Sequence, residues 1–248
     1  NSIVLDGAVT SVAIPGNNPI VSFQVTNAVT GKGIRGLKKF AFAIAQLKPG
    51  ANGSPNGWLS YMLTPSGTTP GRPLYETAGY TVLDNGDGSY TVKLAKDIKN
   101  VTNAGAGVTY DASLTHRVAV QVRSLSFIVT DAAGNAVNPS TDRTTGVVLN
   151  SNFKNEKILF SEFIPATPSV TPTEQRNIVK TEACVACHTK LGVTTPHGGL
   201  SDVRLCVLCH TSQRANGQTA STESPAGTFN APVATTGSQA GKVQTYVV

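Results

Sequence analysis

Two short segments of this sequence contain the same arrangement of two cysteines and a histidine, Cys-x-x-Cys-His, which is the attachment signature of c-type haem. Two thiols three positions apart on a helical turn can each form a thioether with one haem vinyl group, and the imidazole that follows can bind the iron. The two segments are Cys184, Cys187 and His188, and Cys206, Cys209 and His210. The sequence therefore predicts two haem c groups per chain.

A structural zinc site is the strongest competing interpretation of the four cysteines. Eighteen residues separate Cys187 from Cys206, a spacing that also fits two Cys-x-x-Cys pairs around one zinc ion. A thioredoxin-like redox pair would need a βαβ setting, which the flanking sequence lacks, and two disulfides would give the histidines no role. Because two of only four histidines directly follow a Cys-x-x-Cys, we favour haem.

The other two histidines are candidates for the distal side of the irons, where low-potential multihaem cytochromes commonly use a second histidine. His197 lies between the motifs in the sequence Thr-Pro-His-Gly-Gly, whose turn-forming residues could bring the ring to an iron; an exposed loop position is the alternative. His116 lies at the start of a predicted strand, where a structural or surface role is the default and ligation the alternative. One haem could therefore lack a sixth ligand from this chain.

No pattern for another chemistry accompanies the motifs, since the sequence shows no nucleophile–base pair, paired carboxylates or phosphate-binding loop. Closely spaced motifs require closely spaced haems, so we expect electron transfer, with metal-reductase activity as an option. A dihaem peroxidase is an alternative, but it needs an open iron position, which is lost if His116 and His197 both bind iron. The third interpretation is an extracellular adhesion module with tethered haems.

Composition and charge narrow the function further. The formal net charge is +6, but Lys and Arg are scattered and the longest basic run is Lys38-Lys39, so we expect a solvated basic surface and no nucleic-acid binding. No apolar run reaches the roughly 18 residues of a membrane helix. With 24 Gly, 14 Pro and only 14% charged residues, the composition is typical of an exported β-rich protein, and we expect that a leader was removed or lies outside this sequence.

Residues 1–163 are predicted to form an antiparallel β domain, either a sandwich or a barrel. Apolar residues alternate with other residues around positions 20–25, 90–94 and 118–122. A period of two places the apolar set of each segment on one face of a sheet. The fold class we expect is therefore mainly β.

Turn-forming sequences separate the predicted strands. Residues 84–88 and 131–135 are rich in Asp, Asn and Gly, and they predict hairpin connections. Residues 48–73 are rich in Pro, Gly, Ser and Asn, and they predict a long surface loop. Trp58 and Tyr61 are expected to anchor that loop to the core, with an exposed aromatic binding spot as the alternative.

A domain boundary follows the β domain. Three prolines in residues 165–172 predict an extended linker, which we place at 164–176. Residues 174–180 could form one or two helical turns. Residues 177–212 are the predicted dihaem segment, with little regular structure, and residues 213–248 are a tail of low complexity that cannot build a core alone.

Together these features resemble the decahaem outer-membrane cytochromes of metal-reducing bacteria, the OmcA/MtrC family. In the β domain the resemblance lies at residues 33–37 (Gly-Ile-Arg-Gly-Leu), 85–92 (Asn-Gly-Asp-Gly-Ser-Tyr-Thr-Val) and 110–120, and in the haem segment it covers 178–210. Many cytochromes contain the haem motifs, so the match in the β domain is what points to this family.

The resemblance implies a split β-barrel or Greek-key fold for residues 1–163, on the outward face of the outer membrane or outside the cell. It implies that electrons pass from a membrane-spanning porin–cytochrome complex, or another multihaem cytochrome, to extracellular metal oxides, metal ions or flavins. It also implies that His188 and His210 are proximal ligands and that His197 is a distal ligand.

The chain departs from the family in containing two motifs where family members have ten haems, and it has no His-rich stretch after the second motif. One explanation is that it is the N-terminal portion of a longer cytochrome. We favour this explanation because residues 213–248 resemble a connecting loop. The other is a short dihaem relative whose missing haem ligand comes from a further subunit.

Overall fold

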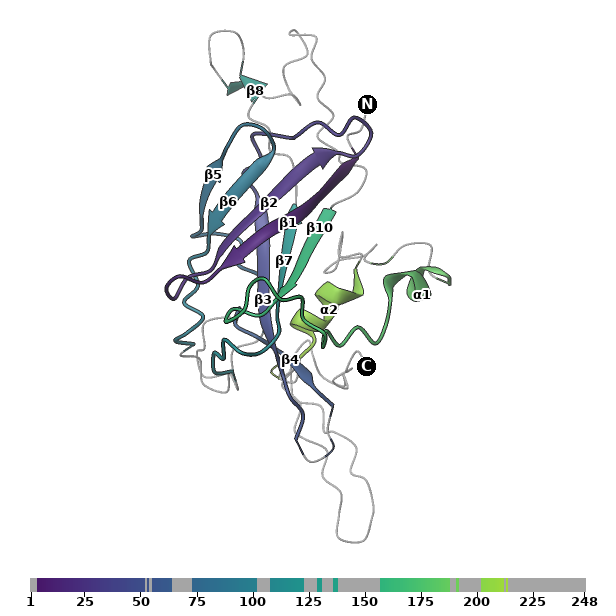
Figure 1. Cartoon of the computed structure of the whole chain (residues 1–248). Coiled ribbons are helices and arrows are strands. Elements are labelled where there is room, and N and C mark those ends of the chain that lie inside the picture. Colours follow the sequence, from purple (N-terminus) through teal and green to yellow (C-terminus); the bar gives the residue numbers. More distant parts are fainter. Residues whose placement is uncertain are drawn as a thin grey trace, which may run out of the picture.

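The structure of the chain is a computed structural model that describes residues 4–51, 53, 55–63, 73–101, 108–122, 129–130, 136–137, 157–187, 191, 202–211 and 213. Within these residues the chain forms two four-stranded sheets, a two-stranded hairpin and two short helices (Figure 1). All neighbouring strands are antiparallel.

The first sheet consists, in spatial order, of β1 (Leu5–Ala13), β2 (Ile20–Asn27), β6 (Ser89–Lys93) and β5 (Thr81–Asp84). The second consists of β10 (Lys157–Phe163), β7 (His116–Val122), β3 (Phe40–Lys48) and β4 (Gly57–Ser60). The hairpin is formed by β8 (Val129–Thr130) and β9 (Ala136–Val137). The helices are α1 (Thr181–Val185) and α2 (Val203–Cys209).

The two four-stranded sheets face each other across an apolar core. The alternating residues predicted to face one side are fully buried, namely Val21, Phe23, Val25, Val118, Val120 and Val122. At the centre, Phe23 stacks on Tyr90 with ring centroids 5.5 Å apart and meets Phe40 edge-on at 5.2 Å. Such aromatic pairs stabilise a core beyond the area that they bury. The expected mainly β, antiparallel fold is confirmed.

The hydrogen bonding of the sheets is that of a sandwich, since no strand pair joins the two larger sheets within the described residues. The sheets approach each other where β1 lies beside β10 (Figure 1). There Lys157 Nζ lies 2.8 Å from Asp6 Oδ1. Both side chains are exposed to water, so this ion pair contributes little to stability.

The structure corrects two sequence-based predictions. Residues 48–73 are not a loop throughout, because β4 lies within them; its Trp58 is buried, and so is Tyr61, as the anchoring prediction requires. Residues 174–180 contain no helix, and α1 begins instead at Thr181.

The predicted hairpin at 84–88 joins β5 to β6. The Gly86 N–H donates to Asp84 Oδ1 at 2.8 Å, and Gly86 and Gly88 have φ values of 83° and 93°, a region that glycine enters without steric cost. The other predicted turn, at 131–135, lies outside the described residues, although β8 and β9 on either side of it do pair.

The first two β-domain segments that show the family resemblance touch each other in the sandwich. The Tyr90 hydroxyl donates to the carbonyl oxygen of Ile34 at 2.6 Å. A Cβ atom on Gly33 would lie 1.6 Å from the carbonyl oxygen of Asp87, so the two backbones are too close for any side chain at this position.

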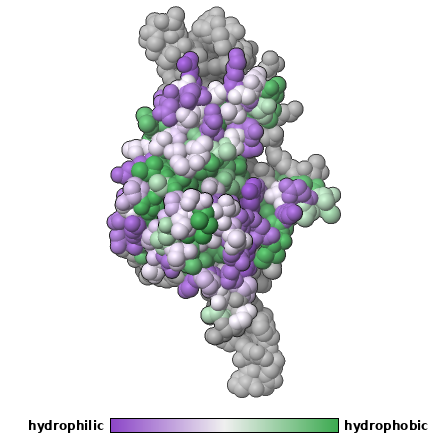
Figure 2. All heavy atoms as spheres, viewed as in Figure 1, coloured by the Kyte–Doolittle hydropathy of each residue, from purple (hydrophilic) through white to green (hydrophobic). Residues whose placement is uncertain are grey.

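The surface of the described residues is mixed in character. Hydrophilic and hydrophobic residues are interspersed on the face shown in Figure 2. Exposed large apolar side chains include Leu83 on β5 and Val185 on α1, and scattered residues of this kind are common on protein surfaces. Neither of the described helices has the length and apolar character needed to cross a membrane.

Replacing Gly33 by alanine should destabilise the sandwich, because the backbone at Asp87 must move away from the new Cβ. We expect Gly33→Ala to lower the free energy of unfolding by roughly 2–3 kcal/mol, measured by urea denaturation. Gly16→Ala is the matched control, since nothing lies within 4 Å of a Cβ there. Equal stabilities of the two variants would contradict this close approach.

Candidate haem-attachment site

Helix α2, which contains the cysteines of the second motif, lies on the outer face of the second sheet, the face turned away from the core (Figure 1). Leu205 and Leu208 are at most 1% exposed. They share one apolar cluster with residues of β3, β4 and β7, namely Ala43, Ala45, Leu47, Trp58 and Ala119. Leu208 is one of the two spacer residues of Cys-x-x-Cys, so the motif itself anchors the helix.

The thiols of the second motif lie on a neighbouring face of α2. Cys206 and Cys209 each follow one residue after a buried leucine, which turns them about 100° around the helix axis from Leu205 and Leu208. Both cysteines are partly buried. The helix therefore faces the sheet with its leucines and presents two thiols together on one flank.

Both ends of α2 are defined by hydrogen bonds. The Asp202 carboxylate caps the first turn by accepting the Arg204 N–H at 2.9 Å. The last turn closes with the His210 N–H, which donates to the carbonyl oxygen of Cys206 at 2.8 Å. Burial raises the pKa of the Cys206 thiol. His210 thus follows the two thiols on the same helical turn, as haem attachment requires.

The first motif begins on the shorter helix α1, which has no buried residue. Cys184 is partly buried and Cys187 is exposed, and the Cys187 N–H donates to the carbonyl oxygen of Cys184 at 3.3 Å. The start of α1 is tied to α2, because the Val203 N–H donates to Thr181 Oγ1 at 3.2 Å. This bond holds the two motifs beside each other.

Among the residues that the structure describes, the cysteines are not gathered around one metal position. All four cysteines belong to the described part of the chain, and they are thiols without disulfides. Within that part, no three His, Cys, Asp or Glu side chains come together as metal ligands, whereas a zinc site made by cysteines alone needs four thiolates around one ion. The two pairs lie on separate segments, one at α1 and one on α2.

The structure places only some of the predicted histidine ligands. His210 lies at the end of α2 and is partly buried. His188, predicted as the first proximal ligand, and His197, predicted as a distal ligand, lie outside the described residues.

His116 is fully buried in the sandwich core. Its Nδ1–H donates to the carbonyl oxygen of Leu114 at 2.9 Å, because a carbonyl can only accept. Its Nε2 lies 2.8 Å from the Tyr61 hydroxyl, which also lies 2.7 Å from Gln46 Oε1. Both ring nitrogens have partners, so this geometry argues against His116 as an iron ligand and assigns it a structural role.

Arg117, on the outer face of β7, joins the sandwich to the chain that leads to α1. Its Nε–H donates to Glu162 Oε1 at 2.7 Å, and its Nη2 group donates to Asn177 Oδ1 at 2.6 Å and to the Gln175 carbonyl oxygen at 3.1 Å. The guanidinium carbon lies 4.4 Å from the ring centre of Trp58. The arginine side chain is only 1% exposed, so these contacts compensate a buried charge.

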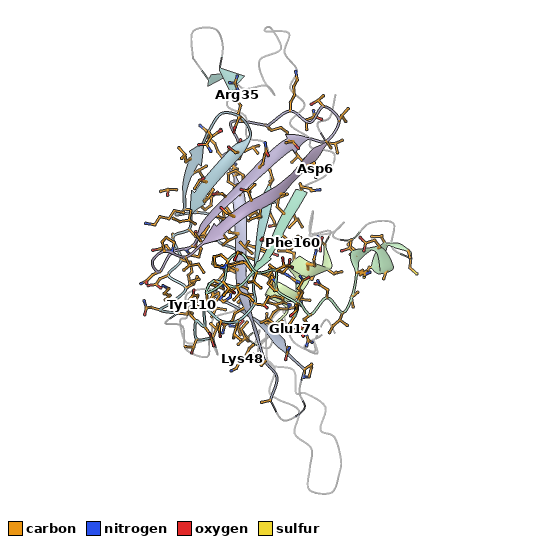
Figure 3. All side chains as sticks on the ribbon, viewed as in Figure 1. Asp6, Arg35, Lys48, Tyr110, Phe160 and Glu174 are labelled. Carbon is orange, nitrogen blue, oxygen red and sulfur yellow. The ribbon has the colours of Figure 1, made fainter. Side chains whose placement is uncertain are left out.

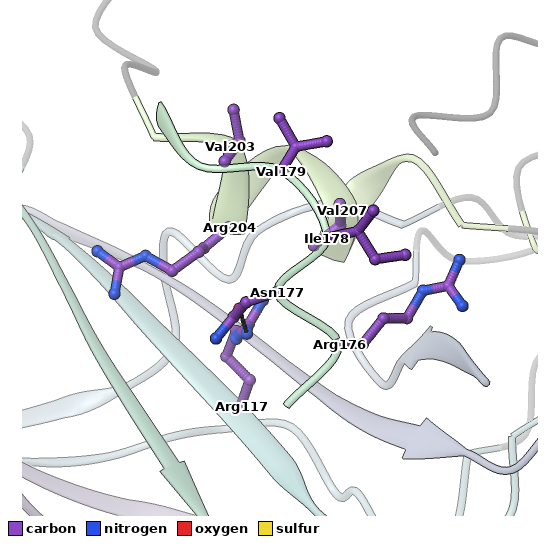
Figure 4. Close-up of a pocket in the computed structure, with 8 residues that line it drawn as sticks. All are labelled: Arg117, Arg176, Asn177, Ile178, Val179, Val203, Arg204 and Val207. Carbon is purple, nitrogen blue, oxygen red and sulfur yellow. Dashed lines mark hydrogen bonds between the residues drawn. The ribbon is translucent and has the colours of Figure 1, made fainter. Parts of the chain in front are cut away.

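A small pocket lies between this network and α2, and Figure 4 shows three arginines around it, Arg117, Arg176 and Arg204. Residues 176–179 form one wall, and Val203 and Val207 of α2 form another. Arg176 Nη1 donates to the carbonyl oxygen of Asn56, just before β4. The valine side of α2 therefore faces residues 176–179.

Two of these anchoring residues, Gln213 and Arg117, are not predicted from the sequence. The side-chain amide of Gln213 pairs with the backbone of Ser60 as the backbone of a neighbouring strand would. Its Oε1 accepts the Ser60 N–H at 2.7 Å, and its Nε2 donates to the Ser60 carbonyl oxygen at 3.0 Å. No sequence pattern distinguishes this glutamine. Arg117 did give a signal, since it is a charged residue inside the alternating pattern of β7.

Comparisons with known proteins agree with this arrangement. The family model of the outer membrane cytochrome MtrC/MtrF-like domains II/IV matches residues 176–244. The crystal structure of MtrC from Shewanella baltica OS185 is similar at 28% identity with a TM-score of 0.58, covering 84% of this chain and 30% of that one. No curated protein sequence matches the chain.

The chain is a relative of the OmcA/MtrC-family outer-membrane cytochromes. The chain is also similar in fold to the crystal structure of the outer membrane decahaem cytochrome OmcA, with a TM-score of 0.64 at 22% identity. The match covers 86% of the chain and 30% of OmcA. The chain therefore spans about a third of the length of MtrC and OmcA.

Removing the Arg117 charge alone should strongly destabilise this OmcA/MtrC relative, because Glu162 would keep a carboxylate without its partner. We expect Arg117→Met to cost about 3–5 kcal/mol in urea denaturation. The double variant Arg117→Met/Glu162→Met should cost clearly less, since it removes both charges. A double variant at least as unstable as the single one would show that the ion pair is not the reason for the loss.

His116 should make the stability of the OmcA/MtrC relative depend on pH. Burial lowers its pKa from the ordinary 6.5 to about 4, so the unfolded chain takes up this proton first as the pH falls. The contribution of neutral His116 to the free energy of unfolding is complete above pH 6.5. It is lost between pH 6.5 and 4, by up to about 1.4 kcal/mol per pH unit. Urea denaturation at several pH values measures this slope. His116→Gln should flatten it, and an unchanged slope in that variant would assign the effect elsewhere.

Proposed function

We propose that this chain transfers electrons through two covalently bound haem c groups. Cys184 and Cys187 would hold the first group and Cys206 and Cys209 the second. His188 and His210 would be the proximal ligands of the two irons. When bound, haem supplies a one-electron couple whose potential depends on its axial ligands and surroundings.

The observation that best supports this proposal is the geometry of the second motif. Cys206 and Cys209 lie on one turn of α2 as thiols, and His210 ends that turn. The leucines on the neighbouring face hold the turn against the sheet. A thioether-attached group would therefore start from a rigid position, which fits a cofactor that must keep a fixed distance from its redox partner.

The protein's own contribution is to set the spacing of the two motifs. The hydrogen bond between Thr181 and Val203 joins the starts of α1 and α2. The covalent links at their thiols would then fix two porphyrins close to each other. Because electron tunnelling falls steeply with distance, this short connection supports transfer between the two groups.

His197 is our proposed distal ligand, from the loop between the motifs. The sixth position of the other iron would then be filled either by a later part of a longer chain or by another subunit. The proposed division of the chain is residues 1–163 as the β scaffold, 164–176 as the linker, 177–212 as the dihaem segment and 213–248 as a loop or tail of low complexity.

The whole protein would work at the outer face of the outer membrane or outside the cell, as the likeness to MtrC suggests. Its partners would be a porin–cytochrome complex or another multihaem cytochrome. Extracellular metal oxides, metal ions or flavins would accept the electrons. The similarity of the haem segment to domains II/IV of outer membrane cytochromes supports this assignment.

The haem content tests the proposal directly. After expression in a host with cytochrome c maturation, the pyridine haemochrome assay should give two haems per chain, and the intact mass should exceed that of the polypeptide by two haem groups. Cys184→Ala/Cys187→Ala and Cys206→Ala/Cys209→Ala should each retain one haem. Material with no Soret absorbance and the mass of the bare chain would refute the proposal.

A further inference from the structure

The side chain of Gln213 holds the chain that follows the second motif against β4. Gln213 is 7% exposed, and its amide pairs with both backbone groups of Ser60, which is fully buried. Its Oε1 also accepts a hydrogen bond from the Thr211 hydroxyl at 3.0 Å, and Thr211 Oγ1 accepts the Gln213 N–H at 3.2 Å. These hydrogen bonds join Ser60, Thr211 and Gln213 into one buried cluster, which we call the Gln213 latch.

The latch requires an amide side chain. A backbone N–H can only donate and a carbonyl oxygen can only accept, so Oε1 of Gln213 must face the Ser60 N–H and Nε2 must face the Ser60 carbonyl oxygen. An ionised carboxylate only accepts and an ammonium group only donates, so neither could make both bonds. Loss of the amide would leave two backbone groups of a fully buried residue without these partners, which is costly.

His210 lies between the latch and the buried face of α2. Before it in the chain, Leu208 is fully buried in the apolar cluster under the helix. After it, Thr211 is 6% exposed and belongs to the latch. The His210 N–H itself donates to the carbonyl oxygen of Cys206 at 2.8 Å. The backbone of His210 is therefore fixed from both sides, although the residue is only partly buried.

The anchors of α2 are distributed along its whole length. Near its start, the Arg204 guanidinium carbon lies 4.1 Å from the ring centre of Phe160 on β10, which Figure 3 shows beside the helix. In its middle, the buried leucines share an apolar cluster with Trp58 of β4. Beyond its end, the latch reaches Ser60, two residues after Trp58 on the same strand. The second motif is thus held to the sheet before, within and after its cysteines.

The first motif is held differently. Helix α1 has no buried residue, and Cys187 is exposed. The hydrogen bond between Thr181 and Val203 precedes the cysteines of that motif. Because the latch lies on β4 beyond the second motif, we expect it to act on the second haem and not on the first.

We propose that Gln213 is a positioning residue for the second haem. By fixing the backbone that follows His210, it sets the direction from which the imidazole binds the iron. This inference rests on the proposed function, in which His210 is the proximal ligand of the haem at Cys206 and Cys209. The axial ligand is one of the groups that set the potential of a haem, so a firmly held imidazole gives a defined potential. Gln213 acts through the backbone of His210 and needs no contact with the porphyrin.

Gln213→Met tests the latch in the full chain with both haems, because methionine keeps the approximate length and removes the amide. The midpoint potential of one haem should rise in a spectroelectrochemical titration, since an imidazole that is held less firmly stabilises ferric iron less. The electron paramagnetic resonance signal of that ferric haem should broaden as its ring orientation varies. Thr211→Val, which leaves the bonds to Ser60, should cause a smaller rise. Gln24→Met on the exposed side of β2 is the matched control and should change neither.

Two single-haem backgrounds show which haem responds. In Cys184→Ala/Cys187→Ala, which keeps the second haem, Gln213→Met should raise the potential as in the full chain. In Cys206→Ala/Cys209→Ala, which keeps only the first haem, the potential should stay the same. An unchanged potential and spectrum in the first background, or equal shifts in both, would overturn the inference. A count below two haems in the unsubstituted chain would instead refute the proposed function.

Hydrogen exchange separates positioning from general destabilisation. It is measured in Cys206→Ala/Cys209→Ala, where the second haem cannot itself protect the segment. There Gln213→Met should speed amide exchange in residues 206–211 by roughly tenfold or more, because local opening no longer breaks the latch. Exchange in β3 and β7 should stay as in the same background with Gln213. No change in residues 206–211, or an equal increase throughout the sandwich, would show that Gln213 does not hold His210 in place.

Discussion

The arrangement of the segment that contains the two cysteine motifs depends on one buried guanidinium group. Arg117 stands on a strand whose other face builds the sandwich core, and its charge has almost no access to water. A charge in that position is tolerated only with fixed partners, and here they are a carboxylate of the sheet and two groups of the incoming chain, at Gln175 and Asn177. The linker is thereby joined to the scaffold by electrostatics as well as by packing.

The second sheet has two buried faces, and the two faces differ in composition. The inner face is made of large residues such as Phe42 and Ile44, which fill the space between sheets. The outer face uses alanine along β3, so that a helix can lie close to the strands. Packing of this kind leaves little freedom for α2, and a cofactor attached to it would inherit that rigidity.

The sequence was most informative where the pattern is local. The period-two alternation in β2, β6 and β7 and the turn before β6 identified the sandwich. The two Cys-x-x-Cys-His motifs predict the attachment chemistry, which stays a prediction. The outer face escaped prediction because alanine gives only a weak hydrophobic signal, and β4 was hidden in a segment rich in turn-forming residues. The contacts of Trp58, Arg117 and Leu208 join positions far apart in the chain, which no local pattern encodes.

Trp58 has a consequence for studying maturation of this protein. It is the single tryptophan of the chain, and it lies in the apolar cluster beneath the helix of the second motif. Porphyrins absorb light where indole emits, so energy transfer would quench its fluorescence once a haem is attached nearby. Trp58 would thus serve as an intrinsic optical probe, and the decay of its emission during biogenesis would follow haem loading in real time without any added label.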